Sequence, residues 1–329
     1  MKKLLIMLMV IVQLPMIGQN LERHTKVIKL MGSRFEITAI HENPQVAWNA
    51  INAGIAEISR IERLISSWDS NSQTSEVISQ AGIQPVRVDK ELFDLISRAL
   101  QVSKITDGAF DISYASMDKI WKFDVRMTEM PSEEVVAQAA SKIDYHNVIM
   151  NASDQTVFLK QKGMKIGFGA IGKGYAAQKA KEVMSGMGIK NGVVNASGDL
   201  VAWGKNEKGD PFQVGIADPQ NNEQVLSWLN VENTSVVTSG DYERFVMFDN
   251  VRYAHIIDPR TGYPTTGIKS VTIITANPEL ADALSTSVFV LGVEKGIALI
   301  NQLPGVECLI ITDQDQIKTS ENLSLNDKS

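Results

Sequence analysis

Cysteine is almost absent from this chain, since Cys308 is the only one among 329 residues. One thiol excludes an internal disulfide, and it also excludes a metal site built from several cysteines. Excess positive charge is lacking as well, because 32 Lys and Arg stand against 38 Asp and Glu, a formal net charge of -6. This charge balance does not attract nucleic acid or an anionic membrane over long range, so we expect no nucleic-acid partner.

The apolar run at the start of the chain is too short for a convincing transmembrane helix. Lys2 and Lys3 precede apolar residues 4–12, and Pro15 and Gly18 follow them. This layout is typical of a secretory signal peptide, so we expect residues 1–19 to be cleaved off. No cysteine ends the segment, which argues against a lipoprotein. We therefore expect an exported, periplasmic protein, and the alternative is an uncleaved membrane anchor.

The composition, 44% hydrophobic and 21% charged, is that of an ordinary globular protein. Residues 26–40 alternate apolar and polar side chains on both sides of a Gly-Ser turn, which predicts a pair of strands. Residues 47–69 predict a helix that ends around Trp68, because five isoleucines recur at steps of three and four: Ile51, Ile55, Ile58, Ile61 and Ile65. We expect Asp89 to cap a second helix, and Ser132 with Glu134 to open a third.

From residue 144 onward, short apolar segments with turn signals predict strands at 147–151, 156–160, 165–169, 191–196, 212–218, 235–240 and 244–257. Asp249-Asn250 predicts a hairpin turn within the last of these. Residues 269–312 predict strand, helix, helix, strand. Without repeats or a low-complexity linker, residues 20–315 are expected to form one α+β unit with two lobes at most. The polar tail of residues 316–329 is expected to be frayed, together with the residues just after Thr312.

The segment GFGAIGKG, residues 167–174, fits two nucleotide-binding loops at once. Its glycines have the G-x-G-x-x-G spacing of a dinucleotide-binding turn, and Gly167 to Lys173 have the G-x-x-x-x-G-K of a P-loop. The next strand, GVVNA, ends without the carboxylate that a dinucleotide fold needs. Gly174 stands where a P-loop has the hydroxyl that holds magnesium. Neither loop is therefore complete.

Both loops share one arrangement, a strand that leads through a tight glycine turn into a helix. We expect such a helix over residues 174–184, with backbone N–H groups and Lys173 directed at an anionic group. The alternative is that the glycines only permit close packing of strand and helix.

Asp282, Ser285 and Thr286 lie at i, i+3 and i+4 after Pro278 and share one face of a predicted helix. A carboxylate with two hydroxyls suits Mg²⁺, which takes oxygen ligands and completes its shell with water and substrate phosphates. The alternative is an acidic residue that merely favours the helix N-terminus.

His255 is one of only four histidines, and it stands at a strand end before the rigid turn of residues 258–262, DPRTG. A polar turn, TSGDYER at residues 238–244, precedes that strand. Such a cluster favours a catalytic histidine, although a single histidine can also be purely structural. Trp68 and Tyr175 can stack on a ring or belong to the core.

In this order, the segments resemble the ApbE family, the FAD:protein FMN transferases. The motifs that carry the resemblance run from about residue 28 to 312: MGSRFEI, SSWD, TDGAFDIS, GFGAIGKGYAA, NASGD, TSGDYERF, HIIDPRTGYP and ADALSTSVFVLG. The resemblance implies an α+β, T-fold-like architecture with helices packed on antiparallel-rich mixed sheets. It also implies a reaction in which a threonine of a target protein attacks FAD bound with Mg²⁺, FMN is joined by a phosphoester bond, and AMP is released.

The resemblance assigns roles to individual residues. The metal ligands that it implies are Asp282, Thr286, Ser285 and the main-chain carbonyl of Ala170. The residues that it places near FAD are Met31, Trp68, Ala109, Phe110, Asp111, Gly167, Lys173, His255 and Ile257. His255 is the candidate base for the threonine proton. Two departures from the family are Gly167, where many members have an acidic residue, and Ser197-Gly198, where many have Gly-Gly.

The expected partner is an acceptor protein that carries the modified threonine, such as an exported subunit of an ion-pumping redox complex, which would bring the enzyme loosely near a membrane. Two other functions remain open: a Mg²⁺-dependent FAD pyrophosphatase that yields FMN and AMP, and a non-catalytic flavin-binding protein. The intact set of Asp282, Ser285 and Thr286 argues against the last.

Overall fold

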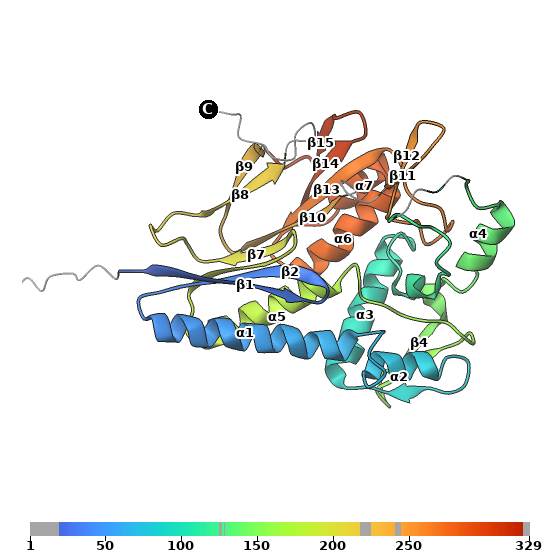
Figure 1. The fold of residues 1–329 in the computed structure, drawn as a ribbon, viewed down its shortest axis with the longest axis horizontal. Helices are drawn as coiled ribbons and strands as arrows, with labels where there is room; N and C mark the ends of the chain where they lie inside the picture. The colour runs from blue at the N-terminus through green and yellow to red at the C-terminus, as the bar shows by residue number, and fades with distance from the viewer. Residues whose placement is uncertain (1–19, 125–126, 128, 218–224, 241–244, 325–329) are drawn as a thin grey trace, which may run out of the picture.

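The computed structural model describes residues 20–124, 127, 129–217, 225–240 and 245–324. The expected signal peptide at residues 1–19 lies outside this range, as do Asp218 and Arg244 at the ends of two predicted strands. An eight-stranded sheet forms the centre of the fold (Figure 1), and every neighbouring pair in it is antiparallel. Its strands, in order across the sheet, are β1 (Glu22–Leu30), β2 (Ser33–His41), β6 (Asn191–Ala196), β7 (Asp199–Trp203), β10 (Thr234–Gly240), β13 (Ile268–Thr275), β14 (Glu307–Thr312) and β15 (Ile317–Thr319).

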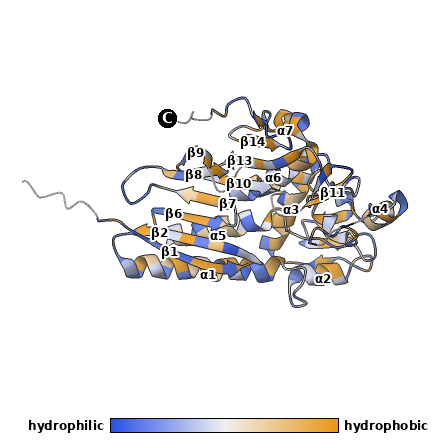
Figure 2. Cartoon of the chain, turned by 45° about the horizontal axis from the view of Figure 1, so that its top comes forward, coloured by the Kyte–Doolittle hydropathy of each residue, from blue (hydrophilic) through white to orange (hydrophobic). Residues whose placement is uncertain are grey.

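A row of helices covers one face of this sheet. α1 (Pro44–Ile65) packs on β1 and β2, α5 (Gly172–Gly186) on β6 and β7, α6 (Pro278–Leu291) on β10 and β13, and α7 (Val293–Ile300) on β14. Strand alternation explains the two faces: Phe35, Ile37 and Ala39 of β2 join the core under the helices, whereas Ile40 joins a cluster on the opposite side. Figure 2 shows apolar residues concentrated in these strands, while α1 carries both polar and apolar residues.

The opposite face of the sheet is covered by the hairpin of β8 (Phe212–Ala217) and β9 (Val225–Val231), through Phe212, Val231 and Ile216. A second hairpin, β11 (Phe245–Phe248) and β12 (Val251–Ala254), turns at Asp249 and Asn250 with positive φ of 49° and 62°. This confirms the predicted turn, since a two-residue hairpin turn of this kind requires φ above zero at both central residues.

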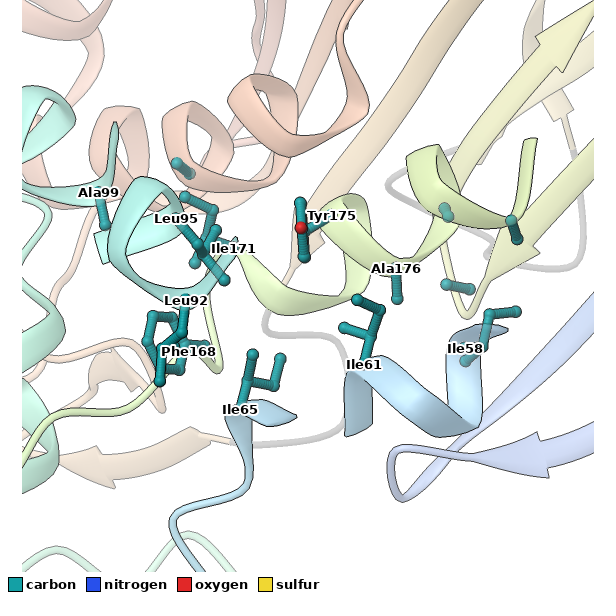
Figure 3. Packing of buried hydrophobic residues seen from close by; sticks show 14 of the residues in the cluster. Ile58, Ile61, Ile65, Leu92, Leu95, Ala99, Phe168, Ile171, Tyr175 and Ala176 are labelled. Carbon is teal, nitrogen blue, oxygen red and sulfur yellow. The ribbon is translucent and has the colours of Figure 1, made fainter. Parts of the chain in front are cut away.

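The remaining elements form a smaller part beside the ends of α1 and α5. They are α2 (Gln73–Ser79), α3 (Lys90–Ile105), α4 (Glu133–Ala140), the 3-10 helices η1 (Ile112–Ser116) and η2 (Tyr145–Asn147), and a sheet of β3 (Val86–Arg87), β5 (Thr156–Leu159) and β4 (Val148–Asn151). Its apolar residues join the same core cluster as those of the large sheet. Figure 3 shows this continuity, with Ile61 and Ile65 of α1, Leu92 and Leu95 of α3, and Ile171 at the start of α5.

The α+β class is confirmed, with helices packed on antiparallel sheets. The strand pair at residues 26–40 is also confirmed, as β1 and β2, and the helix expected over residues 47–69 is α1, which ends at Ile65 and not around Trp68. α3 begins at Lys90 as expected, but the carboxylate of Asp89 does not cap it and instead accepts a hydrogen bond from Gln73 Nε2 at 2.6 Å. No described helix is long and apolar enough to cross a membrane.

Two predictions about the chain path are wrong. Residues 165–169 are not a strand, because their backbone groups pair with η1 instead of a sheet: Gly167 N donates to Ile112 O at 2.9 Å, and Lys165 N donates to Ser116 Oγ at 2.7 Å. The residues after Thr312 are not frayed as far as Thr319, since β15 pairs with β14 and the following Ser320 is buried. The ordered sheet thus extends past the boundary expected at residue 315.

Candidate active site

A cavity of about 960 Å³ lies where the loops and helix ends of these elements converge. It is lined by the loop after α1, by residues 109–115, by the glycine turn before α5, by the β6–β7 turn, by the end of β10, by residues 255–259 and by α6. Every residue that the sequence singles out as catalytic, flavin-binding or metal-binding lines this cavity, except Met31 and Ser285, while Tyr175, offered as a stacking or a core residue, lies in the core. The tertiary structure therefore gathers segments from most of the chain at one place.

The glycine turn brings the first turn of α5 into direct contact with α6. A Cβ atom on Gly174 would lie 2.1 Å from the carbonyl oxygen of Pro278 and 2.8 Å from Cβ of Asp282. The two helices can approach this closely only because residue 174 has no side chain. Gly174 N then donates to Asp282 Oδ2 at 3.0 Å.

This contact corrects one expectation about the turn. Its N–H groups were expected to meet an external anion, but that of Gly174 meets the carboxylate of Asp282, and that of Gly172 donates to Phe168 O at 2.7 Å. A helix N-terminus favours a negative charge of any origin, and here the protein supplies that charge itself.

Lys173, Asp199 and Asp282 form a charged cluster on the cavity wall. Lys173 Nζ donates to Asp199 Oδ2, and the side chains of Lys173 and Asp199 are 27% and 2% exposed. Burial raises the pKa of Asp199, and the nearby charge of Asp282 raises it further against the opposing effect of Lys173. The pKa of Asp282 is raised by burial too, although Lys173 and the backbone N–H of Gly174 oppose this. Burial lowers the pKa of the Lys173 ammonium, but Asp282 and Asp199 outweigh it, so that pKa is raised overall.

The donor set fits a hard cation such as Mg²⁺. Ala170, Asp282 and Thr286 all line the cavity, and a carbonyl, a carboxylate and a hydroxyl are ligands that Mg²⁺ accepts. Two buried carboxyl groups face a single ammonium, so a bound cation would offset the excess negative charge when both are ionised. Among the described residues, His, Cys, Asp and Glu do not gather in threes or more, so such a site would combine one carboxylate with neutral oxygens and leave its other positions to water or to the ligand's phosphates.

Ser285 does not join this donor set. Its side chain is fully buried and absent from the cavity lining, and its hydroxyl donates to Asp282 O at 2.9 Å. A second contact, at 2.7 Å, joins it to the hydroxyl of Ser239, which does line the cavity. Ser285 thus reaches the cavity surface only through its contact with Ser239.

Asp111 organises another part of the cavity wall. Its Oδ1 accepts from Ser113 N at 2.7 Å and from Ser113 Oγ at 2.6 Å, and its Oδ2 accepts from Tyr145 N at 2.9 Å. Burial raises the pKa of this carboxyl, and the three hydrogen bonds oppose that effect. The carboxylate thus fixes the shape of the 109–113 loop, whose Ala109 and Phe110 also line the cavity.

The remaining predicted residues differ in how they relate to the cavity. His255 and Ile257 follow β12 and line the cavity, with the ring of Phe123 6.4 Å from that of His255. Trp68 is 82% exposed, and Lys119 Nζ lies 5.0 Å from its ring centroid. Met31 occupies the β1–β2 turn with φ of 50° and packs against the core instead of lining the cavity.

Among the residues to which sequence reasoning assigned no role are Asp199 of the charged cluster, and Ser239 and Tyr114 of the cavity lining. Asp199 is the first residue of β7, directly after the Ser197-Gly198 turn, and a carboxylate in a buried strand was a signal that could have been used. No comparable signal in the sequence points to Tyr114, since only its position in the 3-10 helix η1 brings it to the cavity. Burial raises the pKa of its phenol to about 12.

Known proteins resemble this chain in both structure and sequence. The chain matches the ApbE protein of Thermotoga maritima with a TM-score of 0.81 and 31% identity, over 91% of this chain and 97% of that one. It is 34% identical over 278 residues to a protein of Treponema pallidum named FAD:protein FMN transferase, which covers 80% of this chain and 76% of the relative. A Klebsiella pneumoniae protein of the same name is 31% identical over 262 residues, 79% of this chain and 81% of the relative.

The architecture is thus that of a solved ApbE protein. The ApbE family itself matches residues 31–310, and the chain belongs to it. The resemblance drawn from the motifs is confirmed, and membership makes the protein an enzyme of this family.

Proposed function

We propose that this protein transfers FMN from FAD to a threonine hydroxyl of an acceptor protein, in a Mg²⁺-dependent reaction that releases AMP. The observation that carries the proposal is the single cavity in which Lys173, Asp282, Thr286 and His255 meet. The relatives named FAD:protein FMN transferase support the choice of donor and acceptor. A volume of about 960 Å³ is at the upper end of the range of ligand pockets and can admit a dinucleotide.

In the proposed reaction, the threonine oxygen forms a bond to the FMN-side phosphorus while the bond from that phosphorus to the oxygen of AMP breaks. His255, which lines the cavity, takes the proton of the attacking hydroxyl as a general base. Lys173 holds a phosphate oxygen and stabilises the charge that develops on the leaving AMP. The residues that would hold Mg²⁺ are Asp282, Thr286 and the carbonyl of Ala170, and the bound ion supplies further neutralisation of pyrophosphate charge.

The test incubates the protein with FAD, Mg²⁺ and an acceptor domain that carries a suitable threonine. Covalent flavin on the acceptor with an equal amount of AMP is the expected result. Release of FMN and AMP without a labelled acceptor would show that the protein hydrolyses FAD and does not transfer FMN. Bound FAD without turnover would show that it is a flavin-binding protein and not a transferase. Asp282→Ala is expected to lower turnover by at least about 100-fold, because it removes the only carboxylate of the proposed metal site. Unchanged AMP release in that variant would contradict the metal assignment.

We further propose that the enzyme acts outside the cytoplasm, where its acceptor would also be exported. The observation is the layout of residues 1–19, which lie outside the described structure. Fractionation of cells that express the full chain is expected to recover a shortened protein in the periplasm. Recovery of the full-length chain in the cytoplasm would contradict this location.

A further inference from the structure

Asp199 has no role in the reaction described above, yet it is one of the most buried acidic side chains of the protein. It is 1% exposed and begins β7 directly after the Ser197-Gly198 turn, whose residues have positive φ of 57° and 103°. β7 is fixed on both sides, since Asp199 pairs with Ala196 of β6 and with Val237 of β10. The carboxylate therefore projects from a rigid position in the middle of the large sheet.

The only cation that the described contacts give to Asp199 is the ammonium of Lys173. Lys173 comes from another element, the first turn of α5, and its side chain reaches the cavity wall. A lysine has a long flexible stem, so its ammonium stays in one place only where a partner holds it. Asp199 is that partner, and it is held by the sheet while Lys173 is held by the helix.

The charge balance shows why such a partner is needed. A divalent cation at Asp282 would lie in the same cavity as the Lys173 ammonium, and like charges in a poorly solvated site repel strongly. Asp199 supplies the compensating negative charge on the side of Lys173. Without it, Lys173 would pair with Asp282 and compete with the cation for that carboxylate.

We propose that Asp199 is a positioning residue that holds the Lys173 ammonium at the cavity wall and balances its charge, so that a divalent cation can bind at Asp282 beside it. This inference deepens the proposed transferase function and rests on its metal site. It assigns Asp199 no contact with the reacting atoms.

The test measures Mn²⁺ binding to the full chain, by electron paramagnetic resonance and by calorimetry, without flavin or acceptor. Mn²⁺ is the probe because it accepts the same oxygen ligands as Mg²⁺. Asp199→Asn is expected to weaken binding by at least about tenfold, because one negative charge is lost next to the cation. Lys173→Met is expected to bind at least as tightly as the unaltered protein. The double variant Lys173→Met/Asp199→Asn is expected to regain the unaltered affinity within about threefold, since both charges of the pair are gone.

Urea unfolding of each variant separates positioning from simple structural support, because loss of Lys173 also relieves the unpaired buried charge that Asp199→Asn leaves in the fold. Asp315→Asn is the matched control, because Asp315 forms the same kind of ion pair with Lys269 away from the cavity. It is expected to leave Mn²⁺ binding unchanged. If Asp199→Asn does not fold, the Mn²⁺ affinities of Lys173→Met and of the double variant still test the inference.

Equal Mn²⁺ affinity in Asp199→Asn and the unaltered protein would overturn the inference, as would weaker binding in Lys173→Met. Absence of Mn²⁺ binding in the unaltered protein would overturn it too. Flavin transfer by the unaltered protein is measured separately, so a failure of the Asp199 inference is distinguished from a failure of the proposed function.

Discussion

At the scale of single residues, Gly174 explains why the turn before α5 resembles a P-loop without being one. A P-loop has Ser or Thr at this position, whereas here any side chain would meet the backbone of Pro278 at 2.1 Å. The space that a hydroxyl would occupy is taken by α6, which brings Asp282 to the turn. The oxygen ligand of the proposed metal site thus comes from another helix.

Gly174→Ala is expected to destabilise the protein by about 2–4 kcal/mol, because the added methyl forces α5 and α6 apart. Urea unfolding measures the change. Gly186→Ala is the control in the same helix, since a Cβ there meets nothing within 4 Å. It is expected to leave stability unchanged or slightly raised. Equal stability of the two variants would show that the close approach of α5 and α6 is absent in solution.

Asp111 is a second residue whose role is local. Asp111→Ala removes the acceptor of three hydrogen bonds and leaves the buried N–H of Ser113 and the half-buried N–H of Tyr145 without their acceptor. We expect a loss of about 2–4 kcal/mol in the free energy of unfolding. Asp111→Asn is expected to lose less, because its amide oxygen can still accept from Ser113. If both variants unfold like the unaltered protein, the carboxylate does not organise this loop.

At the scale of elements, ion pairs join the helices that carry the site. Tyr175 of α5 donates to Glu91 Oε1 of α3 at 2.7 Å, and Arg60 of α1 holds the same carboxylate with contacts of 2.7 and 2.8 Å. Arg98 of α3 holds Glu279 of α6 with contacts of 2.6 and 3.0 Å. Tyr175 lies two residues after Lys173, and Glu279 lies three residues before Asp282. The starts of α5 and α6 are therefore both anchored to α3.

Glu91 makes part of this anchoring dependent on pH. The hydrogen bond from Arg60 lowers the pKa of Glu91, burial opposes it, and the hydrogen bond from Tyr175 lowers it further. A carboxyl with a lowered folded pKa stabilises the protein above its unfolded pKa of about 4.3, and this contribution is lost as pH falls through the folded pKa.

The free energy of unfolding of the unaltered protein is therefore expected to exceed that of Glu91→Gln near neutral pH, and the difference is expected to shrink as the solution is acidified below about pH 4. Urea unfolding at a series of pH values measures it. Glu294→Gln, at an exposed residue of α7, controls for the loss of an acid as such. A difference that stays constant with pH would contradict the assignment.

At the scale of the whole molecule, the large sheet is completed by a strand near the end of the chain. Cys308 N of β14 donates to Ser320 Oγ at 2.9 Å, and Ser320 N donates back to Cys308 O at 3.0 Å. Cys308 is fully buried there, and burial raises the pKa of its thiol to about 11. The residues after Thr312 thus cover β14, and β15 becomes the edge strand of the sheet.

Deletion of residues 317–329 is expected to lower the unfolding free energy by about 2 kcal/mol or more, since it removes β15 and the Ser320 contacts. It should also make Cys308 react faster with a thiol reagent, which is the measurement. Deletion of residues 325–329 alone is the control that keeps β15. Equal thiol reactivity in the two truncated proteins would contradict a protective role for β15.

Much of the fold could be predicted because its signals are local. The isoleucine stripe of α1, the hairpin turn at Asp249-Asn250 and the start of α3 each depend on residues within a few positions of one another. Most of the cavity lining was reached through the motifs that resemble the ApbE family, and no spacing rule alone joins Trp68 to Thr286.

The error at residues 165–169 has a tertiary cause. These residues look like a strand but pair with η1, and the contact of Ser285 with Ser239 is likewise not visible in the spacing of their residues. In both cases, the outcome depends on a partner that is distant in the chain.

Periodicity and turn chemistry act between near neighbours, so the residue order already contains the helices, the hairpins and the α+β class. The chemistry of the cavity depends instead on contacts between distant residues. Lys173 meets Asp199 across 26 residues, and Gly174 meets Asp282 across 108. Burial then sets the charges of these groups, and burial exists only once the helices have packed on the sheet.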